Sequence, residues 1–292
     1  MIYRRDIILG LGLLAAVAGV FLIAIALLVS AGGDGFSTSG QSVALINVQG
    51  GIFDPMPVVK RLERYMRNDD IPVIVIRLNT PGGGISATQE IYETILKSRK
   101  MGKIVIASMG SVAASGGYYI AAACDTVVAT PGTITGSIGV IANFSEFSEL
   151  FDKIGVTFNT RKSGRFKDTG STSREMRDDE KALIDSVIMD SYDQFLEAVC
   201  EGRTLDEDYV RQYADGRVFT GRQAKEYGFV DILGTYQDAI DLAGELAGLG
   251  INPPVVEEKE ELFWEMLLEG ASKALIRGLD TSGPGITYLW KN

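Results

Sequence analysis

The stretch GKIVIASMGSVAASGGYYIAAACD, Gly102 to Asp125, predicts a buried strand, a loop of small residues and a short helix. The run Ile104–Ile106 is β-branched and uncharged, as expected for a strand that is covered on both faces. Ser115 follows two alanines and precedes two glycines at the predicted start of the helix. This position would present its hydroxyl group as a nucleophile.

The same alternation of apolar strands and amphipathic helices continues along the chain. Strands are expected at residues 42–50, 72–78 and 125–130, helices at 54–70, 85–100, 177–203, 205–214 and 220–228, and a further strand leading into a polar loop within 155–176. This pattern is typical of an α/β fold with a mainly parallel sheet, in which sites gather at the carboxyl ends of the strands. The glycine-rich loops Asn79–Gly84 and Gly110–Gly117 both occupy that position, so we expect them to form two walls of one site.

Composition excludes several classes of function. The chain has 292 residues, of which 46% are apolar and 23% charged, an ordinary globular balance. Its net charge of −10 argues against a nucleic-acid partner, because phosphate binding needs a basic face. It contains no histidine, which excludes Ser-His-Asp catalysis, histidine-ligated zinc and histidine bases. A hydrolase of this composition must use lysine, a carboxylate or water held by another ligand.

The two cysteines, Cys124 and Cys200, match no zinc-binding spacing, and we expect no metal site. We interpret both as small core residues. A single disulfide stays open as an alternative if the domain lies outside the cytoplasm.

The amino terminus predicts a membrane anchor. Residues 7–33 carry no charge, and a helix from Ile7 to Val29 would be roughly 34 Å long, enough to cross the ~30 Å hydrocarbon core of a bilayer. A cleaved signal ending at Val29-Ser30-Ala31 is the alternative, but signal cores are shorter, at about 7–15 residues. Arg4 and Arg5 predict a single-pass protein of the cell membrane, with its amino terminus in the cytoplasm and the rest outside.

Residues 1–34 are thus expected to be the anchor and its flank, 35–42 a flexible Gly/Ser linker, 43–250 the globular domain and 251–292 an amphipathic tail. The tail begins at Pro253-Pro254 and carries Phe263, Trp264, Leu267 and Leu268 at helical spacing. We favour packing or assembly over membrane contact for this face, because the acidic residues before it would be repelled by anionic lipid.

The two glycine-rich loops could supply an oxyanion hole. Acyl transfer needs two N–H donors aimed at the developing negative oxygen, and glycine allows the backbone to approach substrate closely. After Pro81, Gly83 (or Gly82) could give one donor, and Gly116 beside Ser115 the other. The alternative is that both loops are glycine-rich only because helices pack closely on the sheet.

Together these segments resemble the signal peptide peptidase A family, a branch of the ClpP/crotonase superfamily of serine peptidases. The resemblance rests on NTPGGG, MGSVAASGGYYIAAACD, GTITGSIGV, SGRFKD with STSREM, and DGRVFTGRQAKEYGFVD, in this order between Val43 and Gly244. It implies a ClpP/crotonase-like fold with repeated β-β-α units. The chain has room for one copy of this domain, as in the short form of the family.

The resemblance also implies a Ser–Lys dyad without a cofactor. By resemblance Ser115 is the nucleophile, Lys167 the general base, and Ser137 the residue that orients the lysine; Gly83 and Gly116 then form the oxyanion hole. A lysine can act as a base at neutral pH where burial disfavours its charged form. We therefore expect the Asp168 side chain to point away from the lysine amine.

In the short form of the family, the subunits form a dome-like homo-oligomeric ring, described as an octamer, in which serine and lysine come from neighbouring chains. The implied activity is endoproteolysis of remnant signal peptides after their release from preproteins. A related membrane peptidase that trims other membrane-protein segments would use the same chemistry. A crotonase-fold enzyme acting on acyl-CoA is disfavoured by the expected export, and a non-catalytic membrane scaffold by the presence of Ser115, Ser137 and Lys167.

Overall fold

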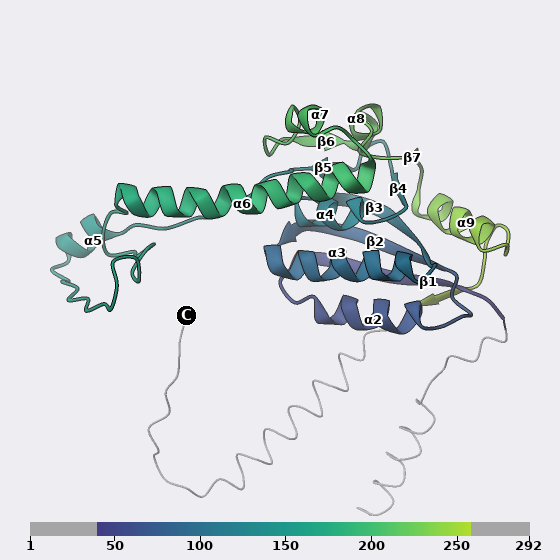
Figure 1. Cartoon of the computed structure of the whole chain (residues 1–292), viewed down its shortest axis with the longest axis horizontal. Coiled ribbons are helices and arrows are strands. Elements are labelled where there is room, and N and C mark those ends of the chain that lie inside the picture. Colours follow the sequence, from purple (N-terminus) through teal and green to yellow (C-terminus); the bar gives the residue numbers. More distant parts are fainter. Residues whose placement is uncertain (1–39, 258–292) are drawn as a thin grey trace, which may run out of the picture. The chain divides into compact units, whose positions relative to one another are not determined.

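The computed structural model describes residues 40–257, whose strands form one eight-stranded sheet (Figure 1). The strands are β1 (Val43–Ile52), β2 (Val73–Gly83), β3 (Ile104–Ala114), β4 (Thr126–Ala129), β5 (Ile134–Gly136), β6 (Val218–Thr220), β7 (Ile232–Leu233) and β8 (Val255–Glu257). Their order is β6-β5-β3-β2-β1-β8, with β4 pairing with β3 and β7 with β4. All pairs are parallel except β5–β6. The expected α/β fold with a mainly parallel sheet is confirmed.

The helices are α2 (Met56–Met66), α3 (Ile85–Lys100), α4 (Gly116–Ala122), α5 (Ser148–Lys153), α6 (Asp178–Arg203), α7 (Glu207–Arg211), α8 (Gly221–Glu226) and α9 (Tyr236–Leu246). Local sequence explains several of their ends. Three acidic residues occupy the first turn of α6 and Arg203 the last, so both ends complement the helix dipole. Thr220 and Thr235 close capping boxes at the starts of α8 and α9.

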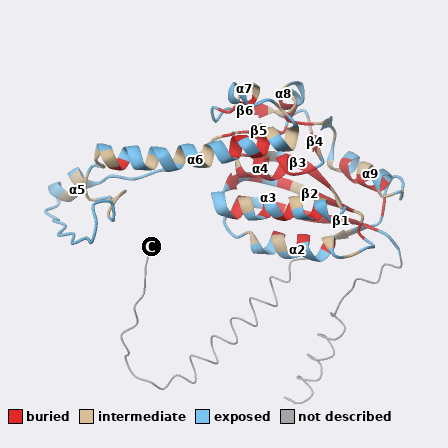
Figure 2. Ribbon diagram, in the orientation of Figure 1, coloured by how far each residue is buried: buried red, intermediate tan, exposed pale blue. Residues whose placement is uncertain are grey.

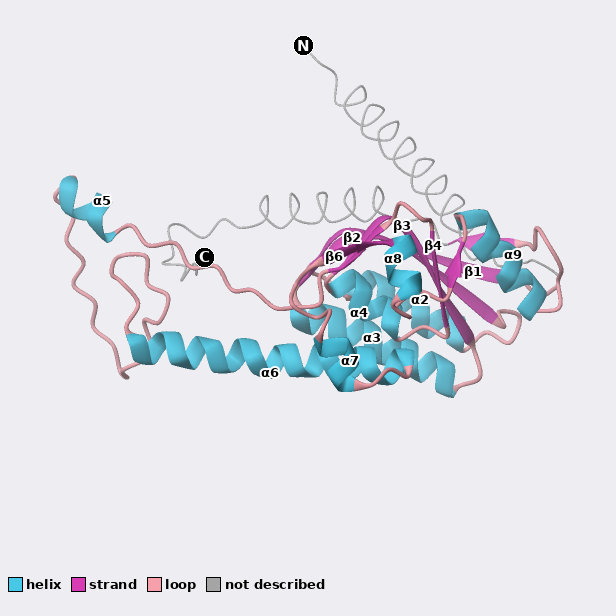
Figure 3. Ribbon diagram, turned by 90° about the horizontal axis from the view of Figure 1, so that it is seen from above, coloured by secondary structure: helices cyan, strands magenta, loops and turns pink. Residues whose placement is uncertain are grey.

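Alternation along the central strands divides the core into two layers. In β1, Ala44, Ile46 and Val48 belong to the cluster that includes α2, α3, α4 and α6, whereas Val43 and Leu45 belong to the cluster with α9. Figure 3 shows α2, α3 and α4 on one side of the sheet. Apart from Glu180 in the first turn, the buried residues of α6 lie in its carboxyl-terminal half (Figure 2). That half contacts α4, which is buried throughout.

Each long central strand changes register or partner part-way. The β1–β2 pairing shifts between Gln49 and Gly51, and the β2–β3 pairing between Leu78 and Thr80. β3 pairs first with β4 and then, beyond Gly110, with β5. The expected repeat of two strands and a helix is therefore realised here as one long irregular strand followed by a helix.

The prediction of a strand within residues 155–176 is wrong. No strand occurs between α5 and α6, and both Val156 and Phe158 are exposed. Their alternation mimics a strand, but a strand also needs a neighbour to satisfy its backbone hydrogen bonds. By contrast, the NTPGGG segment, expected to be a loop, continues β2 as far as Gly83.

The expected anchor and the apolar face of the tail lie outside the described residues. Within residues 40–257, no helix is long and apolar enough to cross a membrane. Past residue 250, β8 still pairs with β1. Cys124 and Cys200 are free thiols in or against the core, and burial raises the pKa of Cys124 to about 12.

The crossing of α6 over the end of α4 depends on Gly202. A Cβ atom there would lie 2.0 Å from the Ala122 carbonyl oxygen. Gly202→Ala should therefore force the helices apart and lower the free energy of unfolding by about 1–3 kcal/mol. Chemical denaturation measures this change. Gly132→Ala is the control, because no atom lies within 4 Å of its added methyl group; equal stability of the two variants would contradict the packing described.

Candidate active site

Ser115 lies at the junction of β3 and α4 in a backbone conformation that side chains rarely adopt. Its φ is 53° and its ψ −121°. Two backbone hydrogen bonds hold it there: the Ser115 N–H donates to Gly136 O at 2.8 Å, and the Tyr119 N–H donates to Ser115 O at 2.9 Å. Strain of this kind persists only where surrounding contacts enforce it, and it clusters at functional sites.

The glycines of β2 lie directly against Ser115. A Cβ on Gly82 would be 2.7 Å from Gly116 N and 2.9 Å from Ser115 Cβ, and Gly82 has a φ of +104°. A Cβ on Gly116 would be 3.3 Å from Gly83 N. The two glycine-rich segments thus meet, as expected from their positions at strand ends. Gly116 also begins α4, where a helix leaves its first N–H groups without an intrahelical acceptor.

A small cavity of about 30 Å³ opens beside Ser115, on the side of the sheet covered by helices. Its lining comes from the end of β2, from α3, α4 and α6, and from the segment after β5: Gly83, Ile85, Thr88, Ser115, Gly116, Tyr119, Gly139, Val140, Ser191 and Phe195. The Tyr119 ring contacts those of Phe195 and Tyr92, with centroids 4.8 and 4.9 Å apart. The part of the lining formed by α4 and α6 is therefore apolar and fixed by aromatic packing.

Ser137 is connected to this site by a backbone hydrogen bond of its neighbour Gly136. It follows Gly136, whose carbonyl accepts the Ser115 N–H, and its own N–H donates to Arg217 O at 2.8 Å. Its φ of 52° is again unusual for a residue other than glycine. Ser137 is half-buried and does not line the cavity.

Lys167 does not lie beside Ser115 of the same chain. It is exposed, lies in the turns between α5 and α6, and does not line the cavity. Figures 1 and 3 both place α5 at the amino-terminal end of α6, away from α4. The sequence motif that contains the lysine is thus separated from the motif that contains the serine.

Ion pairs tie the segment around Lys167 to the start of α6. Arg174 Nη2 lies 2.6 Å from Glu180 Oε1 and 2.9 Å from Asp168 Oδ1, and Lys162 Nζ lies 2.5 Å from Asp168 Oδ1. Arg177 adds a second contact to Glu180 at 2.9 Å. The Asp168 carboxylate is therefore engaged by Lys162 and Arg174.

The same pairs favour the charged form of both acids. Hydrogen bonds from Arg174 and then Lys162 hold the pKa of Asp168 well below its usual range. A hydrogen bond from Arg174, with help from the Arg177 backbone, lowers the pKa of Glu180 from 4.5 to about 2. The Glu180 side chain is fully buried, so breaking these contacts would leave a buried charge without its partner.

Sequence reasoning found the glycines and serines but missed the apolar wall and the ion pairs. Tyr119 and Phe195 are 76 positions apart in the sequence, and no local pattern indicates that their rings are in contact. Arg174 and Glu180 are also unremarkable in sequence. Within residues 40–257, no group of three cysteine or acidic side chains is placed to hold a metal ion.

Two protein-family models match this chain. The model of peptidase family S49 matches residues 97–250, and that of Clp protease matches residues 48–135. A candidate protease from Synechocystis sp. is 42% identical over 224 residues, which are 76% of this chain and 80% of that protein. A candidate signal peptide peptidase SppA from Enterococcus faecium is 39% identical over 62% of this chain and 53% of its own length.

The chloroplastic serine protease SPPA of Arabidopsis thaliana is 32% identical over 68% of this chain, but only 29% of that longer protein is covered. The family match includes Ser115, Ser137 and Lys167. The chain belongs to peptidase family S49 and is a serine peptidase related to the signal peptide peptidase A proteins.

Proposed function

We propose that this protein is a membrane-anchored serine endopeptidase in which Ser115 of one subunit and Lys167 of a neighbouring subunit form the catalytic dyad. The observation that carries the proposal is the strained, doubly hydrogen-bonded backbone of Ser115 against Gly82 and Gly116. It fits a nucleophile whose position must not vary. The chain has no histidine, and of the bases that the composition leaves, the family resemblance favours the amine of Lys167.

Each step of the proposed reaction has a group to perform it. Ser115 Oγ attacks the peptide carbonyl carbon while its proton passes to the neutral Lys167 amine, and Ser137 orients that amine. The carbonyl oxygen becomes an oxyanion, which the N–H groups of Gly83 and Gly116 stabilise. The peptide C–N bond then breaks and the leaving amine takes the proton from lysine. A water molecule then gives a proton to the Lys167 amine and attacks the carbonyl carbon of the acyl-enzyme. The ester C–O bond breaks, and Ser115 Oγ regains its proton from the lysine.

A second subunit explains why serine and lysine are separated. The segment between β5 and α6 exposes large apolar side chains: Ile141, Phe144, Phe147, Leu150, Ile154, Val156, Phe158 and Phe166. On α6 itself, Leu183, Val187 and Met189 are exposed as well. An apolar surface of this extent marks an interaction site in soluble domains. Covering it with the next subunit would carry Lys167 to a neighbouring Ser115, and repetition of a head-to-tail contact generates a ring.

The proposed substrates are extended apolar peptides. The cavity beside Ser115 is too small for a side chain, but Ile85, Tyr119, Val140 and Phe195 give the surface around the serine an apolar character that suits apolar residues. Remnant signal peptides have this character. An amino-terminal anchor with the domain outside the cytoplasm would hold the site beside them and raise its effective concentration. The proposal also includes a ring of eight subunits, the number that the family resemblance implies, and a location at the membrane.

The first prediction concerns the two dyad residues. Ser115→Ala should abolish both turnover of a signal-peptide-like fluorogenic substrate and labelling by a serine-directed phosphonate. Lys167→Ala should lower kcat by at least about 10²-fold, because the proton acceptor is lost. Lys153→Ala, an exposed lysine of the same segment, is the control and should retain activity. Full activity of an assembled Lys167→Ala protein would exclude this lysine as the base.

The second prediction concerns the sharing of the site. Co-expressed Ser115→Ala and Lys167→Ala chains should regain activity, because some interfaces then join an intact serine to an intact lysine. Random mixing of two chains at a head-to-tail interface restores about a quarter of the sites. Specific activity of the purified mixture, compared with either variant alone, measures this. A mixed oligomer without activity would show that each chain supplies its own dyad.

The third prediction concerns Arg174. Arg174→Met should lower kcat with little change in KM, because the segment that carries Lys167 loses the arginine that joins Asp168 to the buried Glu180 of α6. Glu180 has a folded pKa of about 2 against an ordinary 4.5. Its pairing therefore stabilises the fold above about pH 4.5, and this contribution is lost as the pH falls from 4.5 towards 2.

Hydrogen exchange of residues 163–180 tests the structural part of this prediction. Wild type should protect these amides at pH 7 and lose protection towards pH 2, whereas Arg174→Met should lack the protection already at pH 7. Arg165→Met, which removes a mostly exposed arginine paired with Asp179, is the matched control. Identical kcat and exchange in the Arg174 and Arg165 variants would contradict a positioning role.

A further inference from the structure

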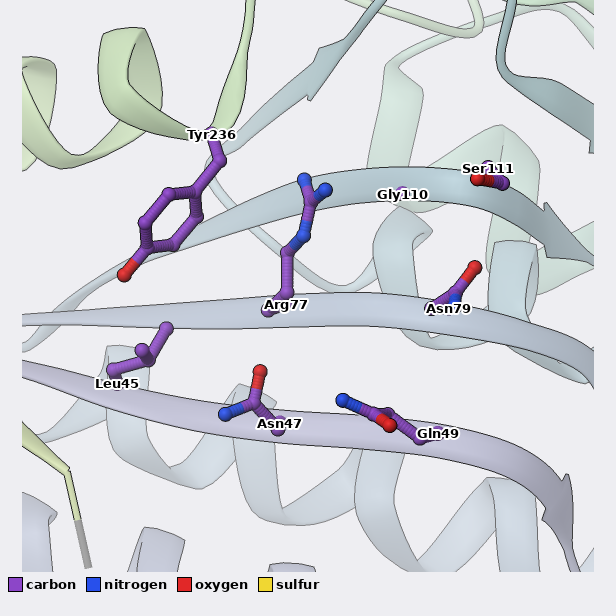
Figure 4. Close-up of a pocket in the computed structure, with 8 residues that line it drawn as sticks. All are labelled: Leu45, Asn47, Gln49, Arg77, Asn79, Gly110, Ser111 and Tyr236. Atoms are coloured by element: carbon purple, nitrogen blue, oxygen red, sulfur yellow. The ribbon is translucent and has the colours of Figure 1, made fainter.

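A polar groove lies on the face of the sheet opposite the Ser115 cavity. At the amino-terminal halves of β1, β2 and β3 this face is apolar and covered by α9. Two residues further along each strand, the same face becomes polar, and Tyr236, the first residue of α9, lies at its edge. The groove has a volume of about 480 Å³, within the ~300–1,000 Å³ typical of ligand sites. Figure 4 shows Asn47, Gln49, Arg77, Asn79, Ser111 and Tyr236 around it.

Arg77 stands near the centre of this groove and is only partly used by the fold. Its Nη1 donates to Ser108 Oγ and to Met109 O, both at 2.9 Å, and its Cζ lies 5.5 Å from the centroid of the Tyr236 ring. A guanidinium has five N–H donors. In the part of the chain that the structure describes, the Nε and Nη2 donors of Arg77 have no acceptor.

No carboxylate pairs with Arg77 among residues 40–257, although most of the other buried or half-buried arginines there have one. Arg99, Arg174 and Arg203 pair with Asp125, Glu180 and Asp231. The acid nearest the groove in the described sheet, Glu257, accepts a hydrogen bond from Asn47. Burial lowers the pKa of Arg77, which shows that its charge has lost part of its hydration without gaining a counter-charge.

We infer that this groove binds the free carboxyl end of an extended peptide, with the α-carboxylate on the open edge of the Arg77 guanidinium. A carboxylate matches the planar fork of arginine through two parallel hydrogen bonds. One guanidinium also balances the single negative charge of a carboxylate, and the groove lining contains no second cation for a phosphate. The amides of Gln49 and Asn79 can donate to and accept from the backbone that precedes the carboxylate.

This site is separate from the one at Ser115. The residues of the two cavities do not overlap, and they lie on opposite faces of the sheet. Binding at the groove requires no turnover. It can be measured in the Ser115→Ala protein, where a peptide is not consumed even if the proposed peptidase activity is correct.

The test is equilibrium dialysis of radiolabelled N-acetyl-trialanine against the full-length Ser115→Ala protein in detergent. The free acid should bind at least about tenfold more tightly than the same peptide with a carboxyl-terminal amide, since a charge-assisted hydrogen bond is lost. Arg77→Gln should remove this difference. Arg211→Gln is the matched control: Arg211 also lies over a tyrosine ring, at 5.8 Å from Tyr192, but is paired with Glu207 and Asp193.

A second variant guards against misfolding of Arg77→Gln. In the native protein the Val112 N–H donates a hydrogen bond to Asn79 Oδ1 at 3.3 Å, and Asn79→Asp keeps an oxygen at this place. The substitution adds a carboxylate next to Arg77 on the same face of β2. The variant should bind the acid no better than the amide. Equal affinity of acid and amide in the Ser115→Ala protein, or undiminished acid binding in folded Asn79→Asp, would overturn the inference. So would equally tight binding of an amidated peptide with an internal glutamate, since that ligand offers no free carboxyl end.

Discussion

The close contact between the glycines of β2 and the turn at Ser115 is the constraint on which the site depends. A single methyl group at Gly82 would collide with both Ser115 and Gly116, so the two strand ends can approach only without side chains. Gly136 fixes the same turn from β5 by accepting the Ser115 N–H. Three strands thus converge on one residue, and their combined pairing maintains a backbone conformation that would otherwise relax. The register irregularities of the long strands lie just before this point and direct the glycines toward it.

The two halves of the proposed dyad are held by different forces. Ser115 is fixed by buried backbone hydrogen bonds and aromatic packing, which depend little on pH or salt. Lys167 lies in a segment held to α6 mainly by Arg174 and its two acidic partners. Such contacts weaken when the acids are protonated. In the proposed assembly, the rigid half of each subunit therefore meets the more adjustable half of its neighbour, and a lone subunit would have the nucleophile without its base.

Much of the fold could be predicted from sequence because its signals are local. β-Branched runs predicted β1 to β4, and apolar spacing with acidic and basic ends predicted α6. Ser115 could be recognised from the small residues around it, since a tight turn requires them. The contact between the distant residues Tyr119 and Phe195 could not be predicted. The pairing of Arg174 with Asp168 and Glu180 is local, but it lies in an irregular loop where no periodic pattern indicates which charges meet. The sequence shows the alternation that places Asn47, Arg77 and Asn79 on one face of the sheet. It does not show how far α9 extends over that face.

The strand expected within residues 155–176, which the structure lacks, coincides with the surface of the proposed subunit contact. Val156 and Phe158 alternate as they would in a strand, yet within residues 40–257 no strand lies beside them and both are exposed. An apolar alternation is stable in water only if something covers one of its faces. The helices and strands between residues 40 and 257 do not cover it, and the apolar residues of α5 and α6 nearby are exposed as well. A pattern typical of a buried element, found in an exposed segment, fits the edge of the proposed subunit interface, and in the proposed assembly this edge would bring Lys167 to a neighbouring Ser115.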